Sequence, residues 1–386
     1  MTHALLTEAR KLDDWLSTQR RTLHMLPELS LYEFKTSAHC FSELERLGLK
    51  PRKLWGEGFI CDIDGPNAKG RVALRADMDA LPIQELNDIP YRSKHDGVAH
   101  MCGHDTHMTV LLGTARVLLG MRDKLKRNVR LLFQPCEELP PGGAPGMIEY
   151  GCLDGVDEIY GLHNIPTLEV GKVATCTGPM TAAADIFEIR IIGRGGHASR
   201  PQDSLDPIPA ACELVGMLQT LVARRVAPFE QAVVSVTKVK AGTTHNIIPD
   251  EAELVGTVRT YEEPVRARII AEMGRMVEAV ANAHGLKHEY KYLRGYDSIV
   301  NHASGAEAVA KAAAEVVGAD SVDSSYEKQT WGEDFAYYLQ KKPGAFFLIG
   351  SGNKAKGITN PLHSARFNVD ESCMAIGVAV MAKLVT

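Results

Sequence analysis

Short apolar runs alternate along the chain with longer segments in which apolar residues recur at helical spacing. We interpret the runs as buried strands, at Val72–Ala76, Val129–Phe133, Ile159–Leu162 and Ala345–Ile349. The segments with helical spacing include Thr36–Leu47, Thr109–Leu119 and Ala306–Val317. An alternation of strands and helices is typical of α/β domains built on a largely parallel sheet.

The middle of the chain has a different order of elements. It reads as strand, helix, strand, strand, helix and strand, which is the ferredoxin-like order. These elements are Ile186–Ile192, Pro207–Ala223, Ala232–Val239, Ala252–Arg259, Val265–Ala283 and Lys287–Leu293. In the first strand, apolar Phe187, Ile189 and Ile191 alternate with other residues, which indicates a strand with one covered face. We therefore predict an α/β domain (residues 1–183 and 296–386) interrupted by an inserted α+β domain (residues 184–295).

Composition narrows the class of protein. The 386 residues are 45% hydrophobic and 24% charged, with a formal net charge of -5, which argues against a nucleic-acid partner. We find no apolar run long enough to cross a membrane, and the N-terminal residues favour an amphipathic surface helix over a signal peptide. The eight scattered cysteines form no C-x-x-C pair, so we expect a reducing, cytoplasmic environment.

Polar clusters stand directly after the predicted outer-domain strands. They are Asp77–Asp79, Gln134–Glu138, His163–Asn164 and, beyond a glycine-rich loop, Pro361–Ser364. A fifth cluster, His100–His107, precedes the helix predicted to begin near Thr109. Functional sites of open α/β sheets form outside the carboxyl ends of the strands, so we expect these segments to converge.

The side chains of these clusters are typical metal ligands. Cys102 and His104 are separated by one glycine, so a loop can turn both toward one centre. With Glu138, His163 and His363 they offer sulfur, nitrogen and oxygen donors, which suit zinc and, through the carboxylate, manganese. Five candidates exceed one tetrahedral site and favour two adjacent metals that share a ligand. Glu137 beside Glu138 would then be a general base.

Each feature alone has an ordinary structural interpretation. A single Cys-x-His pair is a weak signal, adjacent glutamates are typical of a solvated helix start, and a lone histidine often ends a strand. His197, in the glycine-rich loop Gly193–Ser199, reads from spacing alone as an exposed loop residue, and Trp331–Asp334 as a helix N-terminus. The shared placement of the outer-domain clusters after strands is what favours a metal site.

Taken together, the clusters resemble the M20 metallopeptidase family. The resemblance is to its amidohydrolase branch, which includes hippurate hydrolases, auxin-conjugate hydrolases and N-acyl-L-amino acid amidohydrolases. The matching segments occur in order along almost the whole chain: Arg75–Ile83, Met101–His107, Gln134–Glu138, Gly161–Asn164, Gly193–Ser199, His245–Asp250 and Pro361–Ser364.

The resemblance implies a phosphorylase/hydrolase-like catalytic domain with a mixed sheet and an inserted ferredoxin-like lid or dimerisation domain. It assigns the metal ligands as Cys102, His104, Glu138, His163 and His363. Glu137 would be the general base, with Asp79 orienting a ligand. His197 would stabilise the oxyanion, in this family often from the partner subunit, and Asn246 and Arg259 would bind the substrate near its carboxylate.

The sequence departs from the wider peptidase pattern at two places. Asp77 stands where those peptidases carry a metal-binding histidine, and the proline pair in Leu139–Gly143 is an addition that would reshape the pocket wall. We predict a homodimeric, possibly tetrameric amidohydrolase of N-acyl amino acids. It would hold two divalent ions per subunit, Zn²⁺ or Mn²⁺, with Co²⁺ or Ni²⁺ as alternatives. A carboxypeptidase or dipeptidase with the same machinery, and a non-catalytic metal-binding protein, are the competing interpretations.

Overall fold

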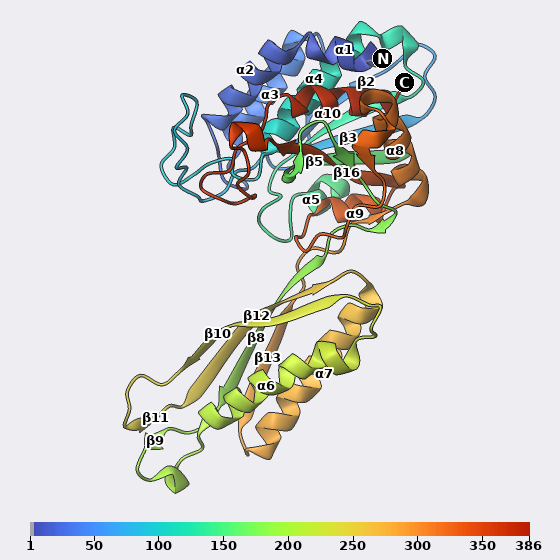
Figure 1. Ribbon diagram of the computed structural model, residues 1–386. Coiled ribbons are helices and arrows are strands. Elements are labelled where there is room, and N and C mark those ends of the chain that lie inside the picture. The colour runs from blue at the N-terminus through green and yellow to red at the C-terminus, as the bar shows by residue number, and fades with distance from the viewer. Residues whose placement is uncertain (1–3) are drawn as a thin grey trace. The chain divides into compact units, whose positions relative to one another are not determined.

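The computed structural model describes residues 4–386, which form two compact units (Figure 1). The larger unit comprises the chain up to Met180, Ile299–Glu327 and Asp334–Thr386. The smaller unit comprises Thr181–Ser298 and a short return segment, Lys328–Glu333. The return segment belongs to the smaller unit because Ala182 N–H and the Tyr261 hydroxyl donate hydrogen bonds to its backbone carbonyls.

The larger unit is built on a mixed sheet with the strand order β1-β2-β4-β3-β5-β16-β6-β15. Its four central strands are parallel, namely β4 (Asn128–Gln134), β3 (Arg71–Asp77), β5 (Glu158–Glu169) and β16 (Gly344–Gly352). The outer strands are β1 (Arg52–Lys53), β2 (Phe59–Ile63), β6 (Val173–Ala174) and β15 (Val322–Asp323). Because the central strands run the same way, their carboxyl ends meet at one edge of the sheet.

Helices cover both faces of this sheet, which is why its strands are apolar on both sides. Every residue of β16 is buried. In Figure 1, α4 (His104–Gly120) and α10 (Cys373–Lys383) lie on one side of the sheet, with α5 (Ala144–Glu149) and α9 (Phe335–Leu339) on the other. The remaining helices of this unit are α1 (Ala4–Arg10), α2 (Asp13–His24), α3 (Phe34–Arg46), α8 (Ala303–Val317) and the 3₁₀ turns η1 (Arg122–Lys124), η3 (Ala319–Ser321) and η4 (Lys354–Lys356).

Several element boundaries differ from the sequence prediction, and three of these differences matter for the larger unit. β5 continues past Leu162 to Glu169, because β16 keeps pairing with it through Gly352. Helix α4 begins at His104 and not near Thr109, directly after Gly103 in the left-handed conformation. The expected single N-terminal helix is two helices, α1 and α2, and residues 1–3 of that expected helix lie outside the described residues.

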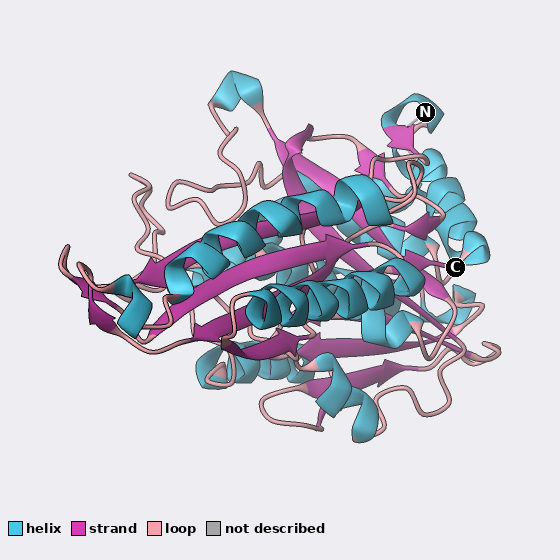
Figure 2. Cartoon of the chain, turned by 90° about the horizontal axis from the view of Figure 1, so that it is seen from below, coloured by secondary structure: helices cyan, strands magenta, loops and turns pink. Residues whose placement is uncertain are grey.

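The smaller unit is an antiparallel sheet covered by two long helices. The strands lie in the order β10 (Ala232–Ala241), β12 (Glu251–Thr260), β8 (Ala183–Ile192) and β13 (Lys287–Leu293). Helices α6 (Pro207–Arg225) and α7 (Glu263–Ala283) pack side by side on one face (Figures 1 and 2). Buried residues alternate with more exposed ones along β12, as expected for a sheet with one covered face. The predicted fold class is confirmed.

Two small two-stranded sheets complete the strands of the described residues. One pairs β9 (Gly196–His197) with β11 (Ile247–Ile248). The 3₁₀ turn η2 (Pro201–Asp203) follows β9 along the chain. The other pairs β7 (Gly178–Pro179) with β14 (Val300–Asn301). Within residues 4–386, no helix has both the length and the apolar character needed to cross a membrane.

Candidate metal centre

The predicted ligands of the larger unit meet at the carboxyl edge of its parallel strands. Glu137 and Glu138 follow the end of β4, and Cys102 and His104 stand at the start of α4. The shorter predicted strand placed His163 after its end, but His163 lies within β5. The pairing of β3 with β5 ends at Gly161, so the β5 segment that carries His163 has no β3 partner and its side chain can face the centre.

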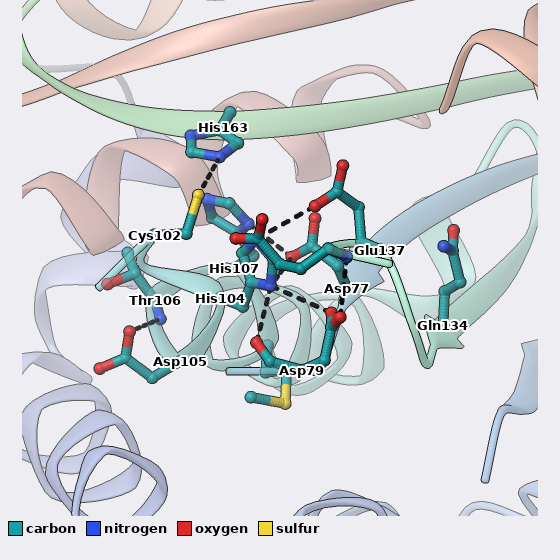
Figure 3. A network of polar contacts seen from close by, with 12 residues as sticks. Asp77, Asp79, Cys102, His104, Asp105, Thr106, His107, Gln134, Glu137 and His163 are labelled. Carbon is teal, nitrogen blue, oxygen red and sulfur yellow. Dashed lines mark hydrogen bonds and ion pairs between the residues drawn. The ribbon is translucent and has the colours of Figure 1, made fainter. Parts of the chain in front are cut away.

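Donor atoms of the six predicted residues form three overlapping groups, each within 4.8 Å. The groups are Cys102 with His104 and His163, Cys102 with Glu138 and His363, and His104 with Glu137 and Glu138. Figure 3 shows Cys102, His104 and His163 turned toward one another, with the Cys102 sulfur 3.3 Å from His163 Nε2. Groups that share members are what two neighbouring metal ions with common ligands require.

The His104 imidazole fits a metal ligand. Its Nδ1 donates a hydrogen bond to the Asp79 backbone carbonyl at 2.8 Å, so Nε2 carries the lone pair. Nε2 is buried without a hydrogen-bond partner, 3.9 Å from a Glu137 oxygen and 3.8 Å from a Glu138 oxygen. Burial lowers the pKa of His104, but Asp77, Asp79 and Glu138 outweigh burial and raise it to about 10.

The thiol and the second imidazole fit the same chemistry. Burial, together with the carboxylates of Glu138 and Glu137, raises the pKa of the Cys102 thiol well above its usual value, so a thiolate here requires a nearby cation. Burial lowers the pKa of His163, which keeps its imidazole neutral and able to coordinate. Its Nδ1 donates to the Asn164 carbonyl at 2.6 Å, which leaves Nε2 facing Cys102.

His363 completes the set from a distant part of the chain. Its Nε2 lies 3.4 Å from Glu138 Oε1, an oxygen with no hydrogen-bond partner. Its backbone N–H donates to the Met101 carbonyl at 2.8 Å, which ties this loop to the Cys102 segment. With a φ of 61°, His363 is in the left-handed region, which is costly for a residue with a side chain and recurs at functional sites. Its side chain is 52% exposed, whereas that of His104 is fully buried, so His363 faces the open side of the centre.

The carboxylates of Asp79 and Asp77 form hydrogen bonds to the candidate ligands or to their neighbours. Asp79 accepts hydrogen bonds from Glu138 N–H at 2.8 Å and from the Ser30 hydroxyl at 2.7 Å, and its other oxygen lies 3.3 Å from His104 Nδ1. Asp77 binds His107 Nδ1 at 2.7 Å, and the His107 Nε2 accepts the Asn164 N–H. Asp77 is thus engaged in supporting neighbours, in the position where wider peptidases carry a metal-binding histidine. Such partners fix the orientation of ligating side chains.

The sequence prediction missed one supporting network. Arg75 in β3 is fully buried and donates to Asp334 at 2.8 Å and to Gln134 at 2.8 Å. Asp334 also accepts hydrogen bonds from the Gln134 side-chain amide at 2.7 Å and from the Ala144 N–H at 2.9 Å, so it joins β3, β4 and the start of α5. Asp334 does precede α9, but its carboxylate serves this network and not the helix end. The available signal was Arg75 itself, since a charged residue inside a buried strand requires a carboxylate partner.

The remaining predicted residues lie in the smaller unit, and two of them are neighbours. His197 is exposed on β9, and its Nδ1 accepts hydrogen bonds from Ser199 N–H at 3.2 Å and from the Ser199 hydroxyl at 2.9 Å. Asn246 is also exposed, and its backbone carbonyl accepts the Ala198 N–H at 3.1 Å. His197 thus presents Nε2 to solvent as a donor.

Arg259 lies at the other end of the same unit. It is half-buried near the end of β12, and its Nε donates to the Thr330 carbonyl at 3.0 Å. The His197 hairpin is tied to the start of β12, because Gly195 N–H donates to Asp250 at 2.8 Å. Arg259 lies eight residues after Glu251 along β12, which is about 26 Å at the usual strand rise. Within one subunit, His197 and Arg259 therefore do not contact the same small molecule.

Comparison with known proteins decides the family. Residues 73–386 match the model of peptidase family M20/M25/M40. The chain belongs to this family. Among relatives in the family, N-acetylcysteine deacetylase of Bacillus subtilis is 40% identical over 96% of this chain and 95% of its own. Thermostable carboxypeptidase 1 of Saccharolobus solfataricus is 37% identical over 98% of this chain and 97% of its own.

A solved structure of an M20 protein has a similar fold over nearly the whole chain. The Bacillus subtilis YXEP protein, described as a dinuclear metal binding peptidase from the M20 family, superposes with a TM-score of 0.85 at 36% identity. The match covers 97% of this chain and 98% of that one. The prediction of a metal-dependent M20 hydrolase is confirmed, and the overlapping donor groups agree with a centre for two divalent metals.

Proposed function

We propose that this M20 hydrolase removes the acyl group from N-acyl amino acids, giving a carboxylic acid and a free amino acid. The observation that carries the proposal is the pairing of a dinuclear donor set with an adjacent carboxylate, Glu137, whose oxygen lies 3.9 Å from His104 Nε2. A protein that only stores metal needs no such base. The 40% identity to an N-acetylcysteine deacetylase supports an N-acyl amino acid as the substrate class.

The metals, when bound, polarise the amide carbonyl and lower the pKa of water. Cys102, His104, Glu138, His163 and His363 would hold them. Glu137 takes a proton from the attacking water and later delivers it to the departing amine nitrogen. His197 holds its proton on Nε2, because Nδ1 accepts from Ser199, and donates it in a hydrogen bond to the oxyanion. Asn246 and Arg259 bind the substrate near its carboxylate.

The same roles require a homodimer. Since His197 and Arg259 lie at opposite ends of the β12 strand, one substrate contacts both only if they come from different subunits. In the proposed arrangement His197 and its neighbour Asn246 reach the substrate from one subunit, and Arg259 reaches it from the other. A tetramer of such dimers keeps the same arrangement.

A substrate and metal screen tests the function directly. Metal-free protein is reloaded with Zn²⁺, Mn²⁺, Co²⁺ or Ni²⁺, and each form is assayed with N-acetyl, N-benzoyl and indole-acyl amino acids. Turnover that depends on added metal and releases the free amino acid is the expected result. The thiolate and imidazole donors favour Zn²⁺, while the Glu138 carboxylate also suits Mn²⁺. Absence of turnover with every metal and every acyl group would refute the proposal.

A carboxypeptidase or dipeptidase is the second candidate, because the Saccharolobus carboxypeptidase is 37% identical over nearly the whole chain. The two functions share the metal centre and the base and differ in the group on the acyl side of the scissile bond. Comparing kcat/KM for N-benzoylglycine and for dipeptides of glycine separates them. Preference for the dipeptides by tenfold or more would favour the peptidase.

The proposed setting is the cytoplasm, with small molecules as the partners. All eight cysteines lie within the described residues and are free thiols, which favours a reducing compartment. The net charge of -5 argues against nucleic acid as a partner. Fractionation of the native cells with an antibody to the chain tests the location.

A further inference from the structure

Glu137 and Glu138 are consecutive residues, yet their carboxylates reach the same atom. Oxygens of both lie within 4 Å of His104 Nε2. In an extended strand, neighbouring side chains point to opposite faces. The chain must therefore turn sharply after β4 ends at Gln134 to bring both carboxylates to one side.

Cys136 provides this turn. Its φ of 59° lies in the left-handed region, which residues with a side chain adopt unfavourably. Cys136 is one of three residues other than glycine with positive φ among those the structure describes, and another is the predicted ligand His363. A strained backbone of this kind persists only where its surroundings hold it.

The segment between α2 and α3 holds the turn, although it contains no predicted metal ligand. Glu33 is fully buried at the start of α3 and accepts the Cys136 N–H at 2.7 Å. Two residues further along the turn, the Glu138 N–H is bound by Asp79 at 2.8 Å. Ser30 of the same segment donates to Asp79 at 2.7 Å. Alternate N–H groups of the turn are thus each fixed by a buried carboxylate.

The segment itself is anchored on both sides of this contact. The Glu28 carbonyl accepts the Ala80 N–H at 2.8 Å, next to Asp79. The Glu28 carboxylate accepts the N–H groups of Lys35 and Thr36 at 2.8 and 2.9 Å, in the first turn of α3. The position of Glu33 is therefore fixed by these hydrogen bonds and does not depend on the Cys136 turn that it contacts.

We propose that Glu33 is a positioning residue of the metal centre: its hydrogen bond to Cys136 maintains the left-handed turn that directs Glu137 and Glu138 to one side. This inference rests on the proposed function only for its kinetic readout, because metal binding reports on Glu138 without any substrate.

The role of Glu33 requires an acceptor oxygen and not a charge. Burial and the nearby Asp79 carboxylate raise the pKa of Glu33 to about 7. The amide oxygen of Glu33→Gln can accept the same N–H, whereas Glu33→Ala removes the acceptor. The matched control is Glu43→Ala on the same helix, since Glu43 is a buried carboxylate that contacts Gln19 and lies outside the metal centre.

The experiment measures metal affinity by calorimetry and steady-state kinetics at saturating metal. Glu33→Ala should weaken metal binding and lower kcat, each by about 10–100-fold, the usual range for residues that orient ligands. KM should change by less than about threefold, because the substrate is not contacted. Glu33→Gln should restore both quantities to within about threefold, and Glu43→Ala should leave both unchanged while lowering Tm.

Repeating the Glu33 substitution in a chain that carries Cys136→Gly tests whether Glu33 acts through the left-handed turn. Glycine adopts positive φ without cost, so Cys136→Gly should make the turn independent of Glu33. The loss caused by Glu33→Ala should then shrink at least about threefold in the Cys136→Gly chain. If Glu33→Ala does not fold alone, Glu33→Asp, whose carboxylate is one methylene too short, replaces it in both backgrounds.

Wild-type metal affinity and kcat in folded Glu33→Ala would overturn the proposal, as would an undiminished loss in the Cys136→Gly background. Equal losses in Glu33→Gln and Glu33→Ala would also overturn it, since the acceptor oxygen is present in one and absent in the other. A wild-type protein that binds metal but releases no amino acid from any N-acyl substrate would instead refute the proposed function. The calorimetric comparison of the variants would still decide the role of Glu33.

Discussion

The Cys102 sulfur lies 3.3 Å from Nε2 of His163, although one residue precedes helix α4 and the other lies inside strand β5. Both side chains are buried, and carboxylates of Glu137 and Glu138 raise the pKa of the thiol. Water is largely excluded from this pair, so a cation is the partner that makes the thiolate stable.

Cys102→Ala should therefore lower bound metal and activity together. We expect at least one metal equivalent to be lost on dialysis and turnover to fall by about 100-fold or more, because the proposed role of the thiolate is that of a ligand. Elemental analysis alongside the assay measures both. Cys61→Ala is the control: Cys61 is also buried, in β2, and its loss should reduce stability without reducing metal content. A fully loaded, active Cys102→Ala would assign Cys102 to the core.

Substitution of the adjacent glutamates should separate their roles. Glu137→Gln should retain the metals and lose about 10²–10⁴-fold in kcat, which is typical of removing a general base. Glu138→Gln should instead weaken metal binding, because Glu138 Oε1 also faces His363 at 3.4 Å. Metal titration and kcat are measured on the same preparations. The reverse pattern would exchange the two assignments.

His197→Ala should act on the transition state. We expect kcat to fall by about 10²–10³-fold with a smaller change in KM and no loss of metal, since His197 lies in the smaller unit and is not a ligand. If the partner subunit supplies this residue, mixing inactive Glu137→Gln chains with inactive His197→Ala chains should restore activity. No recovery after verified subunit exchange would contradict the shared site.

Gly103→Ala should damage the metal centre through its backbone. Gly103 has a φ of 94°, and an added Cβ would lie 2.2 Å from the Asn164 side-chain oxygen. We expect a loss of about 1–3 kcal/mol in the free energy of unfolding and weaker metal binding, measured by urea denaturation and calorimetry. Gly97→Ala is the matched control, because Gly97 has a φ of 74° but open space around its Cβ. Equal effects on metal affinity would exclude the steric explanation.

Asp370 should stabilise the fold at neutral pH. Burial raises its pKa, but hydrogen bonds from Lys356, Ser372 and Asn353 outweigh burial and lower it to about 2. Because the folded pKa is below the unfolded one, the contribution is present above about pH 4 and lost as the pH falls toward 2. Asp370→Asn should cost about 1 kcal/mol of unfolding free energy at pH 7 and almost nothing at pH 2. A cost that persists at pH 2 would show that charge is not the cause.

Strand and helix periodicity predicted most of the fold, because the strands are apolar runs ended by polar residues. The β3 prediction, Val72–Ala76, falls within the observed Arg71–Asp77, and the β13 range agrees fully. Local patterns failed where pairing with a distant strand decides the boundary. β5 extends to Glu169 only because β16 pairs with it, and nothing within β5 itself signals that extension.

The candidate ligands stand out in the sequence because metals require a few residue types, and these residues stand together after strands. The residues that hold the candidate ligands in position could not be predicted in the same way. Glu33 and Asp334 are isolated acids in the sequence, and each acts through a backbone N–H or a buried arginine far away in the chain. Such contacts leave no periodic pattern and carry no motif of their own. Only Arg75, a charge within an apolar run, indicated that a buried partner was needed.

The position of His363 sets when the metal centre can first exist during biosynthesis. Cys102 and His104 are synthesised well before His363 and before α10, which packs on α4. At about 5–20 residues per second, roughly 10–50 s pass between Cys102 and His363. A nascent chain in that interval has a thiol and an imidazole but no complete site. Full metal loading therefore cannot precede the synthesis of His363, whatever metal the earlier residues meet in the meantime.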